Sequence, residues 1–256
     1  MSILRRTILI GLALFFTLPF IFLLVQSFAF QWKYPALLPE IFAGQFWANT
    51  FSGGNSLGNS LSLSVGLAVL TSAIATGLAL PVSRAIALSA YRRVWLFLAY
   101  FPFVLAPVVY ATTLKIYMVR LGLSSQVSGI LLGHILIAFP FAVLVLESGW
   151  NQRMFSLMDQ ARTLGASSSD TYRKVVLPGF KALLALCLFQ TFLISWYEYG
   201  LTALLGQSQV RTMPVQVYQF IQESNPALAA LASSLLMLPP LILLLLNRKW
   251  LLRPQL

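Results

Sequence analysis

Few side chains in this sequence could act as acids, bases, nucleophiles or metal ligands. Among 256 residues there are six Asp and Glu, one histidine (His134) and one cysteine (Cys187). They do not form the clusters of His, Cys and carboxylate that metal binding or acid–base catalysis requires. The phosphate-binding pattern G-x-x-x-x-G-K-[ST] is also absent. The sequence therefore predicts no catalytic residue, no metal site and no cofactor bound by this chain, and it argues against an enzyme.

Glu198 lies in a long apolar run, where a carboxylate is costly and invites a functional interpretation. It is a candidate residue of a substrate pathway, where it would accept a cationic solute. Two structural interpretations stay open beside this one. Glu198 could form a hydrogen bond to another helix, or lie at the membrane interface within the aromatic group Trp196, Tyr197 and Tyr199. His134, also in an apolar run, is interpreted as a polar contact between helices.

Two acidic and four basic residues gather in residues 148–180, which we call the charged segment. The ionisable residues at its centre are Asp159, Arg162, Asp170, Arg173 and Lys174. Its first half has the pattern of a short capped helix, with Ser156 and Asp159 as a capping box. Gly165 suits the left-handed residue that ends such a helix.

The second half of the charged segment predicts another short helix. Ser167 and Asp170 form its capping box, and Leu177-Pro178 is expected to end it, because proline disfavours helix in the residue before it. A plain connection does not need so many caps, so we expect a segment of fixed shape. It could lie in the groove of a partner protein, or rest on lipid headgroups; both alternatives stay open on these residues alone.

The composition indicates that lipid surrounds much of the chain. The sequence is 59% hydrophobic and 9% charged, with a mean hydropathy of +0.82, whereas a soluble domain is about 25% charged. Six stretches are long and apolar enough to span a bilayer. They are residues 8–29, 57–80, 94–118, 127–147, 181–203 and 227–246. We therefore predict an all-α, polytopic membrane protein in which residues 1–256 form a single transmembrane domain.

The Lys and Arg residues predict how these spans are oriented. With the N-terminus inside, 13 of the 17 Lys and Arg fall on the cytoplasmic side. The other four are Lys33, Lys115, Arg120 and Arg211. Both termini and the charged segment are therefore expected in the cytoplasm. A net charge of +11 would suggest nucleic acid as the partner of a soluble protein, but cations between apolar runs indicate membrane topology and no nucleic acid.

The charged segment resembles the EAA loop of permease subunits from binding-protein-dependent ABC importers. That family's pattern is E-A-A, three residues, G, nine residues, I-x-L-P. The same spacing places Asp159-Gln160-Ala161, then Gly165, then Val175-Val176-Leu177-Pro178. Asp159 and Gln160 depart from the pattern. GNSLSLSVGLAVLTSAIATGLALPVSRA from Gly58 and ISWYEYG at 194–200 are similar to other parts of the branch that imports spermidine and putrescine, thiamine, aminoethylphosphonate or ferric iron.

This resemblance implies a six-helix ABC importer permease fold of type I in a bacterial inner membrane. It implies that the charged segment is the coupling loop, which docks in a cleft of a separate ATP-binding subunit. The residues carried over by the motif are Asp159, Gln160, Ala161, Gly165, Leu177 and Pro178. ATP and Mg²⁺ would then be bound by the ATPase partner. Closure of the ATPase subunits would move the charged segment and switch the access of the pathway.

The resemblance also implies the other partners. An extracytoplasmic binding protein would deliver a small polar solute, such as a polyamine, thiamine or a phosphonate, to residues 30–56 and 204–226. A second permease subunit would complete the pathway, and the polyamine-like branch favours a heterodimer over two copies of one chain. The competing function is a self-contained secondary transporter or channel without an ATPase. Such carriers usually show internal repeats and several intramembrane ionisable groups, and both are scarce here.

Overall fold

The computed structural model describes residues 3–31, 39, 41–51, 56–104 and 107–251. Lys33 and Arg253, both used in predicting the orientation, lie outside these residues, as does part of the expected binding-protein surface at 30–56. The chain divides into two compact units. Unit 1 contains Met1–Ser64 and Arg211–Pro240, and unit 2 contains Val65–Val210 and Leu241–Leu256. Almost all regular structure in both is helical, as expected where backbone groups must satisfy one another away from water.

Unit 1 combines a long apolar helix with short elements. Its elements are α1 (Ile3–Ser27), β1 (Ala29–Gln31), β2 (Ile41–Phe42), α2 (Gln45–Phe51), the first turns of α3 (Ser56–Leu88), α11 (Met213–Gln222) and most of α12 (Pro226–Leu251). Trp47 on α2 stacks on Phe28, with ring centroids 5.5 Å apart, and donates from Nε1 to Ser27 Oγ at 3.1 Å. The Met213 backbone N–H donates to Ser64 Oγ at 2.7 Å, which ties α11 to α3.

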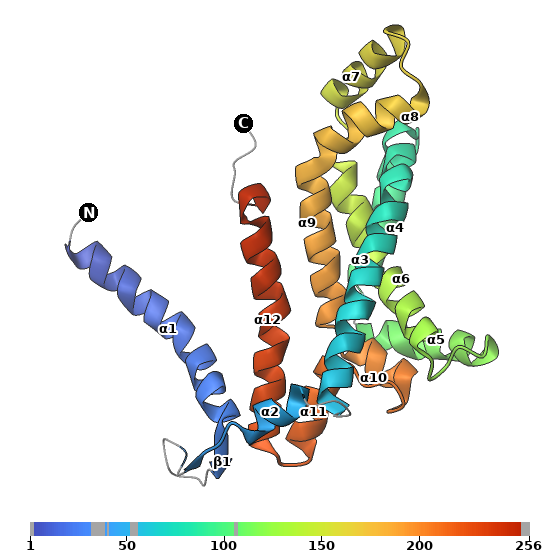
Figure 1. Cartoon of the computed structure of the whole chain (residues 1–256). Coiled ribbons are helices and arrows are strands. Elements are labelled where there is room, and N and C mark those ends of the chain that lie inside the picture. Colours follow the sequence, from blue (N-terminus) through green and yellow to red (C-terminus); the bar gives the residue numbers. More distant parts are fainter. Residues whose placement is uncertain (1–2, 32–38, 40, 52–55, 105–106, 252–256) are drawn as a thin grey trace. The chain divides into compact units, whose positions relative to one another are not determined.

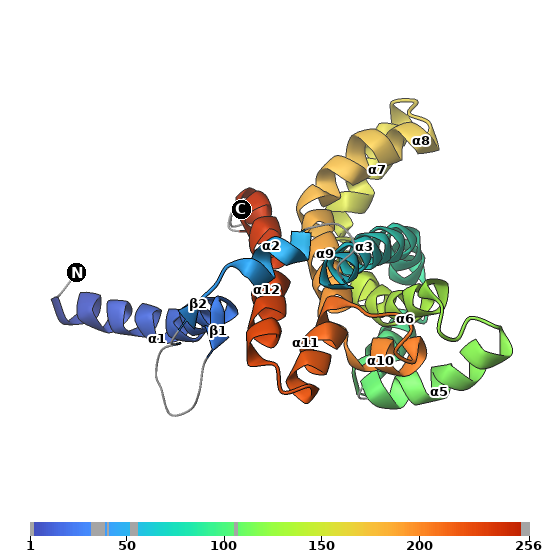
Figure 2. The same cartoon turned by 60° about the horizontal axis from the view of Figure 1, so that its bottom comes forward.

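Unit 2 contains the charged segment and the helices that hold it. Its elements are the rest of α3, α4 (Arg92–Val104), α5 (Pro107–Arg120), α6 (Val127–Glu147), α7 (Gln152–Thr163), α8 (Ser168–Thr171), the π-helix η1 (Tyr172–Val176), α9 (Leu177–Trp196), α10 (Gly200–Gly206) and the end of α12. α9 packs along α6, and α10 packs on both α5 and α6 (Figures 1 and 2). The core of this unit continues from α6 into α7, through Leu146, Trp150 and Met154.

In the described part of the chain, five helices are long and apolar enough to cross a membrane, and the number is six if a bent pair of helices counts as one span. The prediction of six spans is confirmed to this extent, but two spans differ in form. The stretch expected at 94–118 is divided between α4 and α5, whose directions differ by 97°. Pro107 begins α5, and proline neither continues a helix nor favours helix in the residue before it. Residues 105–106 lie outside the described part of the chain.

The span expected at 181–203 also has different boundaries. The helical stretch runs from Ser168 to Trp196, so it begins inside the charged segment and ends before Glu198. Glu198 therefore lies in the break between α9 and α10 rather than within a spanning helix.

Candidate functional site

The charged segment begins with a turn that Asn151 closes. α6 ends at Glu147, and α7 begins at Gln152. Asn151 has an extended backbone, and its Oδ1 accepts from the Met154 backbone N–H at 3.0 Å. The predicted cap at Ser156 is wrong, because Ser156 lies inside α7. Asn is among the strongest N-caps, and its position directly before the first turn was the signal in the sequence that could have identified it.

One face of α7 is anchored in the core, and the other is exposed. Met154 and Met158, four residues apart, are buried in a cluster with Trp150, Val176 and Phe180. Residues one turn apart share a helix face, so these two methionines fix the rotation of α7 about its axis.

Four of the predicted site residues lie together at the far end of α7. Asp159 and Gln160 are exposed, Ala161 is half-buried, and Gly165 follows the helix. Beside them, Leu164 leaves 87% of its surface exposed. The tip of α7 therefore presents both polar and apolar surface.

Gly165 ends α7 as predicted. Its φ is +85°, in the left-handed region, and its N–H bonds to the Arg162 carbonyl at 2.9 Å. The Ala166 N–H bonds to the Ala161 carbonyl at 3.0 Å. These two bonds form a Schellman motif, in which glycine supplies the left-handed residue. A Cβ added at Gly165 would meet no atom within 4 Å, so the need for glycine is conformational and not steric.

The second capped helix also starts where predicted. Ser167 Oγ accepts from the Asp170 backbone N–H at 3.1 Å, and the same hydroxyl donates to Asp170 Oδ2 at 2.7 Å. Asp170 Oδ1 also pairs with Lys174 Nζ at 2.8 Å, one turn later. This pair is exposed to solvent, which screens it, so it orients two side chains and adds little to stability.

Leu177-Pro178 does not end this helix, contrary to the prediction. The backbone passes from α8 through the π-helical η1 into α9, and the Leu177 N–H bonds to the Tyr172 carbonyl. Proline lacks the N–H that an α-helix requires at this position. A π turn widens the helix locally and accommodates such a defect. Leu177 and Pro178, both exposed, therefore belong to the start of α9, and the structure does not bring them together with the end of α7.

A pocket of about 390 Å³ lies where α7 meets α9. Asn151, Arg153 and Met154 line it from the first turn of α7, and Gly179 and Phe180 line it from α9. The pocket is lined by apolar side chains on the α9 side and by some polar ones on the α7 side. It therefore lies within the charged segment, beside the exposed face of α7.

Glu198 caps α10. Its Oε1 accepts from the Leu201 backbone N–H at 2.6 Å, and its side chain is half-buried between α9 and α10. The sequence left open whether Glu198 lines a pathway, bonds to another helix or lies at the membrane interface. The structure shows a structural hydrogen bond, but its partner is the nearby start of α10 and not a distant helix. Its role in a substrate pathway stays a prediction.

His134 joins three helices, as the sequence predicted. Its Nδ1 lies 2.7 Å from Ser195 Oγ on α9, and its Nε2 lies 2.8 Å from Thr202 Oγ1 on α10. Ser195 Oγ also donates to Thr71 Oγ1 on α3 at 3.4 Å. All four side chains are buried. No local pattern identifies these partners, because Ser195 and Thr202 lie 61 and 68 positions from His134.

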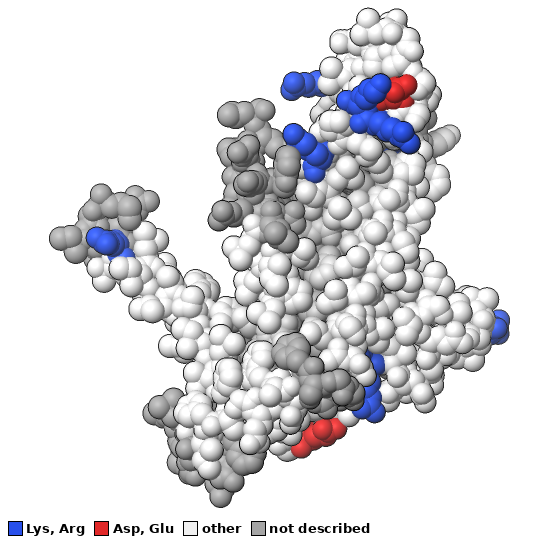
Figure 3. Space-filling model, viewed as in Figure 1, with Lys and Arg blue, Asp and Glu red and all other residues white. Residues whose placement is uncertain are grey.

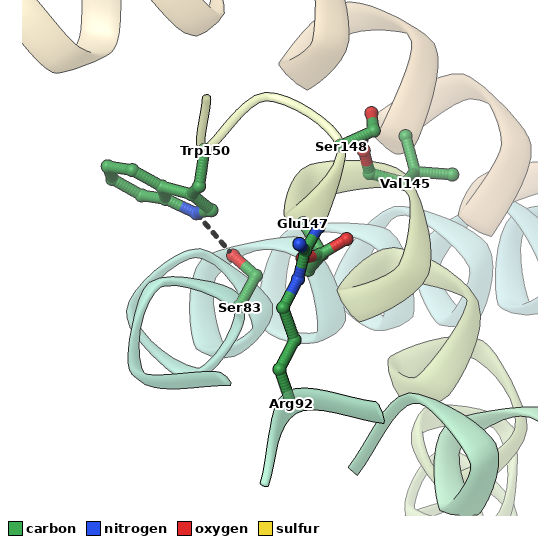
Figure 4. Close-up of polar contacts among 6 residues, drawn as sticks. All are labelled: Ser83, Arg92, Val145, Glu147, Ser148 and Trp150. Carbon is green, nitrogen blue, oxygen red and sulfur yellow. Dashed lines mark hydrogen bonds and ion pairs between the residues drawn. The ribbon is translucent and has the colours of Figure 1, made fainter. Parts of the chain in front are cut away.

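Sequence reasoning also missed the side chains that hold the root of the charged segment. Figure 4 shows Arg92, at the start of α4, reaching Glu147 at the end of α6, and Trp150 donating from Nε1 to Ser83 Oγ at 2.9 Å. Glu147 is 6% exposed, whereas Arg92 lies largely in the open. The loss of this ion pair should therefore cost between the ~1 kcal/mol of an exposed pair and the ~3–5 kcal/mol of a buried one.

Arg84 lies at the other end of the charged segment, against Tyr172. The Arg84 guanidinium carbon is 5.6 Å from the centroid of the Tyr172 ring, and Nη1 donates to the tyrosine hydroxyl at 3.4 Å. Arg84 Nε is buried without a hydrogen-bond partner among the described residues. Stacking on the ring thus holds this side chain more than hydrogen bonding does.

Positive charge is concentrated at one end of unit 2. Within residues 65–210, two Lys and Arg lie on α5, namely Lys115 and Arg120. The others lie on the α3–α4 turn, on the charged segment and in the first turn of α9: Arg84, Arg92, Arg93, Arg153, Arg162, Arg173, Lys174 and Lys181. Figure 3 shows Lys and Arg side chains gathered around α7 and α8. α6 separates the two groups by about 30 Å, since its 21 residues rise 1.5 Å each.

Residues 69–253 match the family described as binding-protein-dependent transport system inner membrane component. The chain belongs to this family. The match includes the charged segment and confirms the resemblance to ABC importer permeases drawn from its motif. It also includes the Arg92–Glu147 pair and the His134 network, so these contacts lie within the part of the chain that is shared with other permeases of the family.

Individual proteins similar to this chain are also named as permeases. The chain is 27% identical over 135 residues to the spermidine/putrescine transport system permease protein PotC of Escherichia coli (strain K12), covering 51% of this chain and 50% of PotC. It is 29% identical over 121 residues to the probable sulfate transport system permease protein cysT of Chlorella vulgaris, covering 46% of each. The chain thus spans about half the length of the curated relatives it matches.

A solved structure has the same fold. It is a crystal structure of a bacterial ABC transporter involved in the import of the acidic polysaccharide alginate, and the TM-score is 0.70. The match covers 96% of this chain and 94% of that one at 19% sequence identity. The predicted all-α fold of an ABC importer permease is therefore confirmed.

Replacing Asn151 tests where α7 begins. We expect Asn151→Ala to lower the free energy of unfolding by about 1 kcal/mol, because the Met154 N–H loses its acceptor. Ser156→Ala, at the disproved cap, should change it by less than about 0.5 kcal/mol. Unfolding can be followed with a thiol-reactive dye, since Cys187 is buried and is the one cysteine in the sequence. Equal effects of the two substitutions would contradict the cap at Asn151.

Replacing His134 tests the buried polar network. His134→Leu leaves the hydroxyls of Ser195 and Thr202 without their ring partner, although each keeps a longer bond of 3.4 Å, to Thr71 Oγ1 and to the Glu198 carbonyl. We therefore expect a loss of roughly 1–3 kcal/mol. Combining it with Ser195→Ala and Thr202→Val should recover part of this loss, because the two hydroxyls that lost the ring are then removed as well. The same thiol-dye assay measures both, with Ser128→Ala on the exposed face of α6 as the control. A triple variant less stable than His134→Leu would contradict the network.

Proposed function

We propose that this chain is a permease subunit of an ATP-driven importer, which forms part of the substrate pathway and is driven by a separate ATP-binding subunit through the charged segment. The observation that carries this proposal is the form of α7. Its root is fixed in the core by Met154 and Met158, and its tip presents Asp159, Gln160 and the exposed Leu164. A rigid helix with a free, partly apolar tip suits insertion into a cleft of a partner protein.

The continuous helix supports a mechanical role for the charged segment. The helix from Ser168 to Trp196 contains no loop, so a displacement of α8 would be carried directly into α9. Closure of the ATP-binding subunits would thereby move a helix of the pathway. Asp159, Gln160, Ala161 and Gly165 would lie at the contact with the ATPase. Leu177 and Pro178, which stand apart from them, would act where the charged segment joins the pathway helix.

We further propose that the charged segment faces the cytoplasm across the bacterial inner membrane. The concentration of Lys and Arg around the charged segment and the α3–α4 turn, against two on α5, supports this orientation by the positive-inside tendency. It implies that both termini are cytoplasmic.

The proposed partners follow from the same role. They are ATP-binding subunits that hold ATP and Mg²⁺, a second permease subunit, and an extracytoplasmic binding protein, with lipid around the spanning helices. We favour a different permease as the second subunit, forming a heterodimer. We propose no cofactor bound by this chain itself and no nucleic-acid partner.

The proposed solute is a small polar compound, such as a polyamine, thiamine or a phosphonate. PotC, which aligns with half of this chain, is named for spermidine and putrescine, and this supports a polyamine-like solute. Glu198, which caps α10 in the break between α9 and α10, is the pathway residue that would meet a cationic solute.

Gly165→Asp tests the docking role of the charged segment. An L-residue at φ +85° is strained by about 1–2 kcal/mol, and a carboxylate at a helix C-terminus is also unfavourable. The strain and the charge would displace the tip of α7 from its partner, and a docking contact weakened by about 1.4 kcal/mol corresponds to tenfold. We therefore expect roughly tenfold or greater loss of ATP-dependent uptake while membrane insertion is unchanged. The variant should also retain less ATPase subunit when the tagged chain is purified from its host.

Gly122→Asp is the matched control. Gly122 has φ +67°, and a Cβ there also meets open space, but it lies in the turn between α5 and α6. The local strain is comparable, yet uptake should stay near that of the unmodified chain. Equal loss in both variants would show that strain alone is responsible. Uptake that persists without ATP, together with no ATPase retained by the unmodified chain, would instead favour a secondary transporter.

Glu198→Gln separates the two roles of Glu198. Glutamine keeps an oxygen that can accept from the Leu201 N–H, so the cap on α10 and the thermal stability should be retained. The negative charge is lost, so the apparent affinity for a cationic solute such as putrescine should fall while the maximal uptake rate is kept. Glu198→Ala should in addition lower stability by about 1 kcal/mol. Unaltered affinity and rate in Glu198→Gln would remove this residue from the pathway.

A further inference from the structure

Six side chains tie the charged segment and the end of α6 to the last turns of α3 and the first residue of α4, a stretch that we call the α3–α4 turn. Two of the ties lie at its entry, where Arg92 pairs with Glu147 and Ser83 accepts from Trp150 (Figure 4). The third lies at its exit, where Arg84 stacks on Tyr172. We call this set the clasp: Ser83, Arg84, Arg92, Glu147, Trp150 and Tyr172.

The clasp holds both ends of the charged segment against one short stretch of chain. Glu147 and Trp150 precede α7, and Tyr172 follows α8. Their partners all lie between Ser83 and Arg92. A displacement of the charged segment would therefore pull on the α3–α4 turn from two sides.

Burial shows that the ties are part of the packed structure. Ser83 is 0% exposed and Trp150 is 5% exposed. Trp150 also packs against the Phe180 ring of α9, with centroids 4.6 Å apart. At Gly149, an added Cβ would lie 2.6 Å from Leu183 Cδ1 and 2.7 Å from Phe180 Cε1. The entry turn thus has no room to move independently of its neighbours.

α4 packs on α6 without burying any of its own residues. None of the thirteen residues from Arg92 to Val104 is buried among the described residues. The Phe103 ring meets Phe141 of α6 edge-on, with centroids 6.3 Å apart, near the far end of α4. At the other end, backbone bonds from Val94 and Trp95 to the Tyr91 carbonyl begin the helix, and the ion pair of Arg92 with buried Glu147 ties this first turn to α6.

We propose that the clasp makes α4 move together with the charged segment, with Arg92 and Glu147 as its positioning residues. The proposal rests on the proposed function, in which an ATPase displaces α7. Through the continuous helix, that displacement reaches α9. Through the clasp it also reaches α3 and α4, so one docking event moves two parts of unit 2 together.

Spin labels on the full chain test the tie without any partner. Labels would replace Phe97 on α4 and Leu164 at the tip of α7, which are 70% and 87% exposed, in a Cys187→Ser background. Electron–electron distances are then compared for the unmodified pair, Arg92→Gln, Glu147→Gln and the double variant in lipid nanodiscs. We expect a broader and shifted distance distribution in all three variants. Arg93→Gln, at the exposed neighbouring arginine, should leave the distribution unchanged.

Melting temperatures of the same variants show whether the Arg92–Glu147 pair positions α4 or only stabilises the fold. Arg92→Gln strands the buried Glu147 carboxylate and should lower the melting temperature, whereas Glu147→Gln leaves an arginine that lies in the open. The double variant strands no charge, so its melting temperature should recover. Its distance distribution should nevertheless stay broad, because the ion pair is absent. Recovery of the narrow distribution together with stability would overturn the positioning role, as would an unchanged distribution in both single variants.

A second arm uses the complex purified from the host with its ATPase subunit. For this arm the label on α7 replaces Leu157, which is 41% exposed, because Leu164 belongs to the proposed docking tip. In the unmodified clasp, a non-hydrolysable ATP analogue should leave the Phe97–Leu157 distance unchanged, because α4 follows α7. In Arg92→Gln and Glu147→Gln the analogue should shift this distance, because α7 then moves alone. A nucleotide-dependent shift with the clasp intact would overturn the proposal. If no ATPase is retained, the proposed function fails, and the measurements on the chain alone still decide whether the clasp ties α4 to α7.

Discussion

Hydrogen-bonded continuity of the backbone from Ser168 to Trp196 joins the charged segment to a helix long enough to cross a membrane. A loop at this junction would have left backbone groups unpaired where the apolar α9 begins, which is costly away from water. The π turn of η1 removes that cost and also accommodates Pro178. The direction of α8 is therefore set by α9, and the position of α7 follows from its packing on Val176 and Phe180.

The cost of leaving polar groups unpaired away from water also explains how the buried side chains of unit 2 are hydrogen-bonded. A buried hydroxyl needs a partner, and Thr191 Oγ1 finds one in the Cys187 carbonyl of its own helix at 2.7 Å. Ser195 and Thr202 instead meet at His134, which satisfies both with its two ring nitrogens. One imidazole thus joins α6, α9 and α10 next to the break that Glu198 caps. This arrangement fixes the geometry of the break.

Local signals in the sequence were sufficient for the helices and for the end of α7. Hydrophobic length located the spans, and Gly165 and Ser167 fall where glycine and capping patterns placed them. The failures have two physical origins. Ser156 and Pro178 were judged by local rules, which the stronger cap at Asn151 and the π turn overrode. The clasp and the His134 network join residues 55 to 124 positions apart, and such pairs depend on tertiary packing that periodicity does not encode.

The relatives are named for solutes of opposite charge. PotC is named for spermidine and putrescine, which are cations, whereas cysT is named for sulfate, an anion. The solved structure of the same fold comes from a transporter of an acidic polysaccharide. Membership of the family therefore does not identify the solute, and function has to be argued from sites rather than from the fold. Within unit 2, two such sites lie apart: the charged segment and the clasp lie at the end of α6 opposite the α9–α10 break that contains Glu198.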